Sequence, residues 1–176
     1  MQPMSNRFPF TTDKLQPLNA ARDWPLLAAA ASALLAFVML FPPWLTSAGM
    51  SLNAFGENML AAGPALIIVM AVAMALLAYG ALATRRAVYL SALLIPASNL
   101  LVLYIVQVAD VCDLAEIGSA SGVSDVSTGP GVWLGFVFSL AAALCAVVAF
   151  ARRSTPRDAA TAPGEPPHIP PDEEGP

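Results

Sequence analysis

Charged side chains are scarce in this sequence, and long parts of it contain none. Asp, Glu, Lys and Arg make up 11% of the residues, against about 25% in ordinary soluble domains. Residues 58–84 and residues 87–109 hold no Asp, Glu, Lys, Arg or His. A charge-free apolar run of about 20 residues is long enough to cross a bilayer as a helix. The composition therefore predicts a membrane protein, with the lipid bilayer as its partner.

Histidine is almost absent, and this restricts the chemistry open to the chain. The single histidine, His168, stands in the proline-rich C-terminal segment, so no Ser-His or Cys-His pair can assemble in a membrane core. The sequence has no glycine-rich phosphate loop and no Cys/His group with metal-ligand spacing. Intramembrane hydrolysis and proton-coupled transport usually need ionisable residues within the spans, and the predicted spans have none. We therefore expect no enzyme, catalytic residue, cofactor or metal.

The charge-free runs predict an all-α membrane protein, a four-transmembrane-helix bundle. The spans fall at about residues 24–41, 59–83, 87–108 and 131–151, inside a transmembrane domain of residues 24–153. Residues 1–23 and residues 154–176 are polar, and the second tail is rich in proline and acidic residues. Because such segments cannot bury a core, both are expected to be disordered tails.

Local signals place the two ends of the first span. Asp23 precedes Trp24-Pro25, which fits a capping residue followed by an early proline. Pro42-Pro43 ends the run, because proline cannot continue the helical hydrogen-bond ladder. A rival interpretation is a signal peptide cleaved near Thr46-Ser47-Ala48. The leading tail is long and carries acidic residues, so we favour a retained anchor.

The few basic residues predict the orientation of the bundle. With four spans, all eight lie on the side of both termini: Arg7, Lys14, Arg22, Arg85, Arg86, Arg152, Arg153 and Arg157. Because Lys and Arg favour the cytoplasmic side, we expect both termini in the cytoplasm and the protein in the bacterial inner membrane. The basic residues form no basic-aromatic strip, so nucleic-acid binding is not expected.

The loop after the first span predicts a small extracytoplasmic β-hairpin. Trp44-Leu45-Thr46 and the segment 50–55 flank Ser47-Ala48-Gly49, a pattern typical of two short strands and a turn. Such a hairpin is too short to be stable alone and must rest on the helix ends. Trp44 and Trp133 fall at the outer interface and Trp24 at the inner one, where aromatic rings act as depth anchors.

The third span has a polar middle that allows two interpretations. Pro96 removes one backbone donor and frees the carbonyl of Ala92, and Ser98 and Asn99 are placed to satisfy the exposed groups. In the first interpretation these residues hold helices together at a kink. In the second, Ser98, Asn99 and Gln107 line a wetted cavity or narrow pore.

Small residues repeat along two spans and predict close helix packing. They recur at every fourth position, as Gly131, Gly135, Ser139 and Ala143 on the last span and as Ala28, Ser32 and Ala36 on the first. Such stripes let another helix approach closely. They serve either the bundle itself, which we favour, or a homo-oligomer interface.

An acidic segment follows the third span. Asp110, Asp113 and Glu116 share one side of a helix that continues beyond the membrane. They are a solvated face or, alternatively, ligands of a hard cation such as Ca²⁺, although EF-hand spacing is missing. Cys112 faces an oxidising compartment, where it is free or joins two protomers. Cys145 lies deep in the last span, where we expect it to pack.

Three short segments carry a resemblance. They are Pro42-Pro43-Trp44, the segment 51–56 (SLNAFG) and the segment 129–135 (GPGVWLG). Together they resemble small four-helix membrane proteins of actinobacteria and other high-GC bacteria, over roughly residues 24–153. The resemblance implies the same fold and brings no catalytic residue. In size and topology alone, the chain is also similar to prophage-encoded four-span exclusion proteins.

These observations favour a non-enzymatic membrane protein that works by association. The small-residue stripes would pack helices, and the cytoplasmic tail of residues 154–176 would recruit a soluble protein partner. The alternative is a membrane-permeabilising or ion-conducting effector, such as a phage-exclusion or defence protein, with the third span lining the path.

Overall fold

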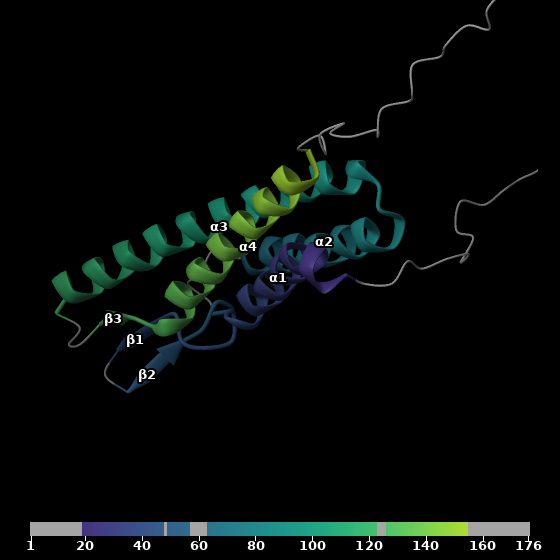
Figure 1. The fold of residues 1–176 in the computed structure, drawn as a ribbon. Helices are drawn as coiled ribbons and strands as arrows, with labels where there is room; N and C mark the ends of the chain where they lie inside the picture. Colours follow the sequence, from purple (N-terminus) through teal and green to yellow (C-terminus); the bar gives the residue numbers. More distant parts are fainter. Residues whose placement is uncertain (1–18, 48, 57–62, 123–125, 155–176) are drawn as a thin grey trace, which may run out of the picture.

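The computed structural model describes residues 19–47, 49–56, 63–122 and 126–154, which are mainly helical (Figure 1). Four helices account for most of them: α1 (Ala20–Val38), α2 (Gly63–Thr84), α3 (Ala87–Ala120) and α4 (Pro130–Ser154). All four are long and apolar enough to cross a membrane. A helix suits these apolar runs because it satisfies every backbone polar group within the segment. The chain is therefore a multi-pass integral membrane protein, as the sequence predicts.

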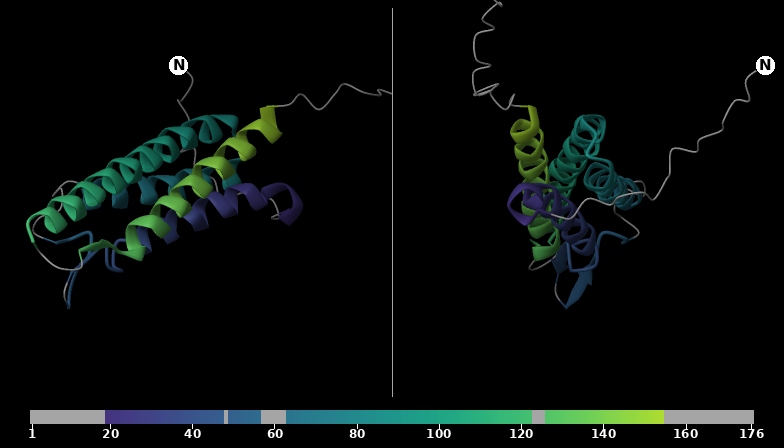
Figure 2. Two further views of the ribbon diagram at one scale, coloured as in Figure 1. Left: turned by 90° about the vertical axis from the view of Figure 1, so that its left-hand side faces the viewer. Right: turned by 45° about the vertical axis from the view of Figure 1, so that its right-hand side comes forward.

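The helices form a bundle in which each packs against two others. α4 lies against α1 and α3, and α2 lies against the same two helices on the other side (Figure 2). Alanine dominates the buried positions, so the backbones can approach closely. Within the helices, the buried alanines are Ala29, Ala33 and Ala36 of α1, Ala71, Ala78 and Ala81 of α2, Ala97 of α3, and Ala142, Ala146 and Ala149 of α4.

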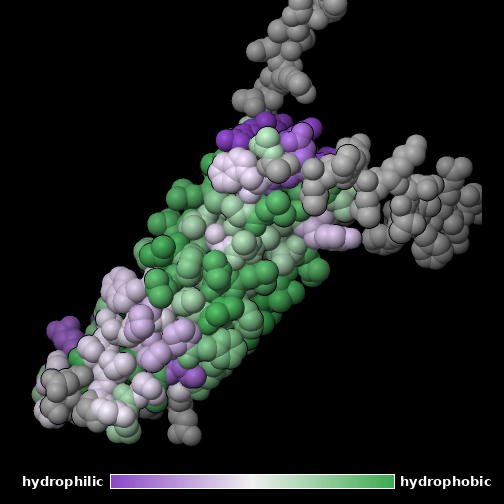
Figure 3. Space-filling model, turned by 60° about the horizontal axis from the view of Figure 1, so that its bottom comes forward, coloured by the Kyte–Doolittle hydropathy of each residue, from purple (hydrophilic) through white to green (hydrophobic). Residues whose placement is uncertain are grey.

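The outer surface of the bundle is apolar along its length. Large exposed side chains include Leu76 of α2, Ile95 of α3 and Leu144 of α4, each more than half exposed. In the space-filling view, a broad hydrophobic band separates hydrophilic groups at the two ends of the molecule (Figure 3). Because a soluble protein rarely exposes contiguous apolar surface of this extent, the band is the surface that contacts lipid.

Two helix boundaries differ from those expected. The N-cap of α1 is Asn19, and Asp23 lies inside the first turn, so the prediction that Asp23 caps the helix is wrong. α1 also ends at Val38, four residues before Pro42-Pro43. Just after this end, the backbone N–H of Phe41 donates to the Val38 carbonyl at 3.2 Å. α3 continues to Ala120 and spans about 50 Å at 1.5 Å per residue. It therefore projects beyond the apolar band.

A small antiparallel sheet lies at one end of the bundle. Its strands are β1 (Leu45–Ser47), β2 (Met50–Leu52) and β3 (Ser127–Thr128), in the order β2-β1-β3. The predicted hairpin of β1 and β2 is confirmed, with Leu45 opposite Leu52. The strand β3 pairs with the free edge of β1, placing Leu45 opposite Thr128. The sheet therefore ties the loop after α1 to the residues that lead into α4.

Candidate functional site

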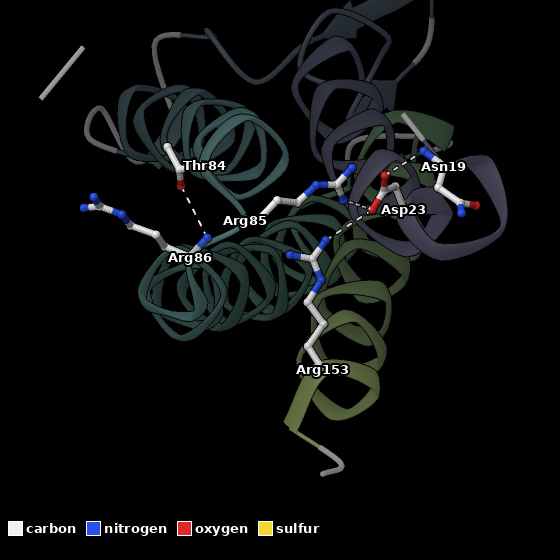
Figure 4. Close-up of polar contacts among 6 residues, drawn as sticks. All are labelled: Asn19, Asp23, Thr84, Arg85, Arg86 and Arg153. Carbon is white, nitrogen blue, oxygen red and sulfur yellow. Dashed lines mark hydrogen bonds and ion pairs between the residues drawn. The ribbon is translucent and has the colours of Figure 1, made fainter. Parts of the chain in front are cut away.

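The ends of all four helices meet around one buried carboxylate. Asp23 of α1 is fully buried, and its Oδ1 accepts hydrogen bonds from Arg85 Nη1 and, at 3.2 Å, from Arg153 Nη2 (Figure 4). Arg85 lies in the turn between α2 and α3, and Arg153 lies in the last turn of α4. We call Asp23, Arg85 and Arg153 the ionic triad. It joins all four helices at the end opposite the sheet.

Local backbone features aim these side chains inward. The second carboxylate oxygen of Asp23, Oδ2, accepts the Asn19 backbone N–H at 3.1 Å, which fixes its rotamer over the start of α1. Arg85 has a positive φ of 56°, so the chain reverses between α2 and α3 within two residues. The hydrogen bond to Asp23 raises the pKa of Arg85 above its usual value, and this guanidinium stays charged. The triad therefore holds two positive charges and one negative charge.

Three further arginines surround the triad. Arg22, Arg86 and Arg152 are exposed, and the guanidinium of Arg152 lies 5.2 Å above the Trp24 ring. We call the triad and these three residues the arginine end. Every arginine among the described residues lies there, which agrees with the grouping that the sequence predicts for Arg85, Arg86, Arg152 and Arg153. Which side of the membrane this end faces stays a prediction.

A tight backbone contact closes the opposite end of the bundle. Gly129 N–H donates to the Trp44 carbonyl at 2.7 Å, and Gly131 N–H donates to the Pro43 carbonyl at 2.9 Å. A side chain on Gly129 would overlap the Pro43 carbonyl. We call Pro42, Pro43, Trp44, Gly129 and Gly131 the clasp. Two of the three segments that carry the resemblance therefore meet in space, and the clasp gives their residues a packing role.

Trp44 is not a membrane-depth anchor. Its side chain is fully buried, and its indole N–H donates to the Met39 carbonyl at 2.8 Å. The expected interfacial role fits Trp24 and Trp133 better, since both side chains are almost half exposed. The clasp encloses Trp44, so the position of this residue at the end of the first span did not predict the exposure of its side chain.

Filling the space beside Trp44 should destabilise the clasp. In Gly131→Ala, the new Cβ would lie 2.6 Å from Trp44 Cδ1 and 2.7 Å from the Pro42 oxygen. We expect the free energy of unfolding to fall by about 1–3 kcal/mol, as for other overpacked sites. Tryptophan fluorescence during denaturant unfolding in micelles measures this. Gly56→Ala is the control, because its Cβ meets nothing closer than 3.3 Å; equal effects of the two changes would contradict the prediction.

Tyr104 connects the clasp to the middle of the bundle. It is fully buried, its ring centroid lies 6.0 Å from that of Trp44, and its hydroxyl donates to the Ala36 carbonyl. Gly135 of α4 lies directly on its ring, where any Cβ would overlap it. Sequence reasoning missed Tyr104. The available signal was a tyrosine in mid-span, since a buried phenol needs a hydrogen-bond partner.

The small-residue stripes lie partly where they were expected. Gly131, Gly135 and Ser139 are buried, but Ala143 is only half-buried and Ala142 takes the buried place. On α1, Ala36 is buried while Ala28 and Ser32 are half-buried, and Ala29 and Ala33 form the inner line. An α-helix has 3.6 residues per turn, so residues spaced by four do not stay on one face. After three such intervals the residue no longer faces the core.

The polar residues of α3 do not share one face. Pro96 is buried within a continuous helix, whereas Ser98 and Asn99 are exposed on the outer surface. Their side chains both donate to the Ile95 carbonyl at 2.9 Å.

Gln107 is separated from Ser98 and Asn99. It is buried against the start of α2, where a Cβ on Gly63 would lie 2.6 Å from its Nε2. Because Gln107 faces the core and the other two face outward, the three residues do not line one path within a single chain.

The extension of α3 carries exposed acidic side chains. Asp113, Glu116 and Cys112 are exposed and Asp110 is half-buried. In the part of the chain that the structure describes, no three His, Cys, Asp or Glu residues are grouped to hold a metal ion. Cys112 and Cys145 are both free thiols. A bond between the Cys112 side chains of two protomers stays a prediction.

The sequence shows the three residues of the ionic triad but does not predict that they meet. Asp23 is the one acidic residue that the described structure places at the arginine end. An acid next to the first apolar run, on the side that holds every basic residue, was the available signal, because a carboxylate there has arginines as its natural partners.

No family model, curated protein or solved structure matches this chain, so its resemblance to small four-helix bacterial membrane proteins stays a prediction.

Proposed function

We propose that this multi-pass membrane protein is non-enzymatic and acts by associating with another transmembrane helix, in the first instance a second copy of itself. The observation that carries the proposal is the position of Asn99. This amide lies near the middle of the predicted third span, 87–108, and is exposed on the outer surface of α3. Hydrocarbon offers it no hydrogen-bond partner, whereas a neighbouring helix does.

The hydrogen bonding of Asn99 leaves capacity for such a partner. Its Nδ2 donates to the Ile95 carbonyl at 2.9 Å, and its Oδ1 accepts no hydrogen bond from the described residues. In a two-fold dimer, each Oδ1 would accept from the second Nδ2 proton of the other Asn99. Ile95 and Val102, both more than half exposed, flank Asn99 and would supply the apolar packing.

Asn99→Leu tests this proposal. We expect the monomer–dimer equilibrium to weaken by about 0.6–2 kcal/mol, the range for interhelical polar contacts in membranes, which is a roughly 3- to 30-fold larger dissociation constant. Fluorescence energy transfer between labelled chains in vesicles measures it. The control is Val102→Leu, which keeps the same face apolar. An unchanged dissociation constant in Asn99→Leu, or equal losses in both variants, would overturn the proposal.

Orientation and localisation complete the proposal. The arginine end would face the cytoplasm of a bacterium, because basic residues are retained on that side of the inner membrane. The tail that would recruit a soluble partner, residues 154–176, lies outside the described residues from position 155 onward. An ion-conducting effector remains the alternative. It requires several chains, because Ser98 and Asn99 face away from the core of one bundle.

A further inference from the structure

The small sheet has one face with large apolar side chains and one face of hydroxyl groups. Leu45 lies opposite Leu52, and Met50 stands two residues before Leu52, so these three side chains share a face. Ser47 and Thr128 complete that face. The other face carries Thr46, Ser51 and Ser127. Two of these hydroxyls, on β1 and β3, are joined by a hydrogen bond of 2.8 Å. The sheet is therefore amphipathic.

The apolar face of the sheet begins on the core of the bundle and continues past it. Leu45 is half-buried and packs against the core, so this face is turned toward the bundle. β3 contacts α3, and the order β2-β1-β3 makes β2 the strand farthest from that helix. The hairpin of β1 and β2 hangs away from the extended end of α3 (Figure 1, Figure 2). On β2, Leu52 is 37% exposed and Met50 is 75% exposed. The apolar face therefore overhangs the edge of the bundle.

Aromatic contacts join this face to the apolar band that contacts lipid. The rings of Phe37 and Phe41 pack edge to face with centroids 5.8 Å apart, and the centroids of Phe41 and Phe55 are 5.7 Å apart. Phe41 and Phe55 are each at least half exposed. Leu52 lies over Gly56, because a Cβ on that glycine would be 3.5 Å from Leu52 Cβ. The exposed apolar surface of α1 therefore continues through these residues onto β2.

We propose that the sheet inserts its apolar face into the surface of the surrounding lipid leaflet, at the boundary between headgroups and acyl chains. In water, Met50, Leu52 and the two exposed phenylalanines would form an apolar patch that soluble surfaces rarely carry. Amphipathic helices at a bilayer surface bury their apolar face about 5–10 Å into this boundary, and an overhanging amphipathic sheet can do the same. The three strands contain no ionisable side chain, so uncharged lipid headgroups are sufficient partners.

Spin labels on the two faces of β2 test the proposal in phosphatidylcholine vesicles. Met50→Cys and Ser51→Cys place a nitroxide at neighbouring positions on opposite faces, in a full chain that also carries Cys112→Ser and Cys145→Ala. Collisions of each label with oxygen, which concentrates among acyl chains, are compared with collisions with a nickel chelate, which stays in water. We expect an oxygen-to-nickel ratio roughly fivefold or more higher at position 50 than at position 51, since only the apolar face reaches below the headgroups.

Two further labels give the reference values. Leu76→Cys, on the exposed side of α2 in the apolar band, reports the ratio in lipid, and Glu116→Cys, on the exposed extension of α3, reports the ratio in water. The label at position 50 should give a ratio nearer to that of position 76, and the label at position 51 a ratio nearer to that of position 116.

Oxidation of the unaltered chain gives a second measurement that needs no labelled variant. A methionine as exposed as Met50 should react with hydrogen peroxide about as fast as free methionine if water surrounds it. Inserted in the leaflet, it should be oxidised at least roughly threefold more slowly than free methionine in the same vesicle suspension. Mass spectrometry of the peptide that contains Met50 measures the rate, and dilution of the protein in lipid should leave the protection unchanged.

Several results would overturn the proposal. Equal nickel access at positions 50 and 51, or oxidation of Met50 as fast as free methionine, would place the sheet in water. A higher oxygen-to-nickel ratio at position 51 would show that the hydroxyl face lies on the lipid. Low collision rates with both reagents at position 50 would show that protein covers the strand, and protection lost on dilution would identify that protein as a second copy. None of these results depends on Asn99, so the proposed association stands or falls separately.

Discussion

Gly135→Val is expected to lower the free energy of unfolding by about 3 kcal/mol or more, at the upper end of the range for overpacked cores. Gly135 lies on the buried Tyr104 ring, and any Cβ would overlap that ring. The phenol cannot move away freely, because its hydroxyl is bonded to the Ala36 carbonyl and its ring packs near Trp44. The substitution therefore forces α4 away from α3 or breaks the Tyr104 hydrogen bond.

A double-mutant cycle separates this clash from the general cost of changing a glycine. Gly135→Ala should cost about 2 kcal/mol in the unaltered chain. In a Tyr104→Leu background the same change should cost much less, because the atoms that Cβ meets, Cε1, Cζ and Oη of Tyr104, are reduced or absent. Denaturant titration in micelles measures both values. Additive costs would show that Gly135 and Tyr104 do not interact as the structure describes.

The helices were predictable because their cause is local. Four apolar segments interrupted by one proline pair and by charges allow few alternatives to membrane helices. The hairpin was predictable for a similar reason, since Gly49 between two β-prone segments has the positive φ, 88°, that a tight turn needs. The strand β3 was not, because two residues carry no periodic pattern and pair with β1 only through the tertiary fold.

The contacts between elements were less predictable than the elements. Pro43 and Gly129 are separated by much of the chain, and their close approach depends on where α1 ends and α4 begins. The position of Trp44 in the sequence predicts an interfacial ring, but the fold encloses it. The sequence allows Asn99 either to bond to a neighbouring helix or to line a pore, and its side chain is exposed on the surface. In each case the residue type was informative, whereas its direction required the arrangement of the helices.

The two ends of the bundle are fastened by different physical means. The clasp relies on close backbone contact at glycines and on the enclosed Trp44 ring. The arginine end relies on charge, in a setting where water is largely excluded from Asp23. The close packing at the clasp does not depend on the surrounding ions. The stability of a buried ionic group falls strongly when any one of its charged side chains is removed. A loss of stability as large as that of Gly135→Val is therefore expected when Asp23 is changed.

Asp23→Asn is expected to lower the free energy of unfolding by about 3–5 kcal/mol, the usual cost of removing one partner from a buried ion pair. The asparagine would remove the carboxylate charge that both Arg85 and Arg153 contact. Reversible unfolding in a neutral detergent measures the loss, because such a detergent supplies no competing anion. Asp113→Asn, at an exposed position on α3, is the charge-matched control and should change little.

A triple variant shows whether this loss reflects stranded charge or lost packing. Replacing the whole ionic triad by apolar residues, as in Asp23→Leu with Arg85→Met and Arg153→Leu, removes the carboxylate and both buried cations together. Because apolar replacement of a complete buried ionic group is often neutral or stabilising, the triple variant should be more stable than Asp23→Asn alone. If it is less stable, the carboxylate is needed for its hydrogen bond to Asn19 at the start of α1, and charge balance is not its main contribution.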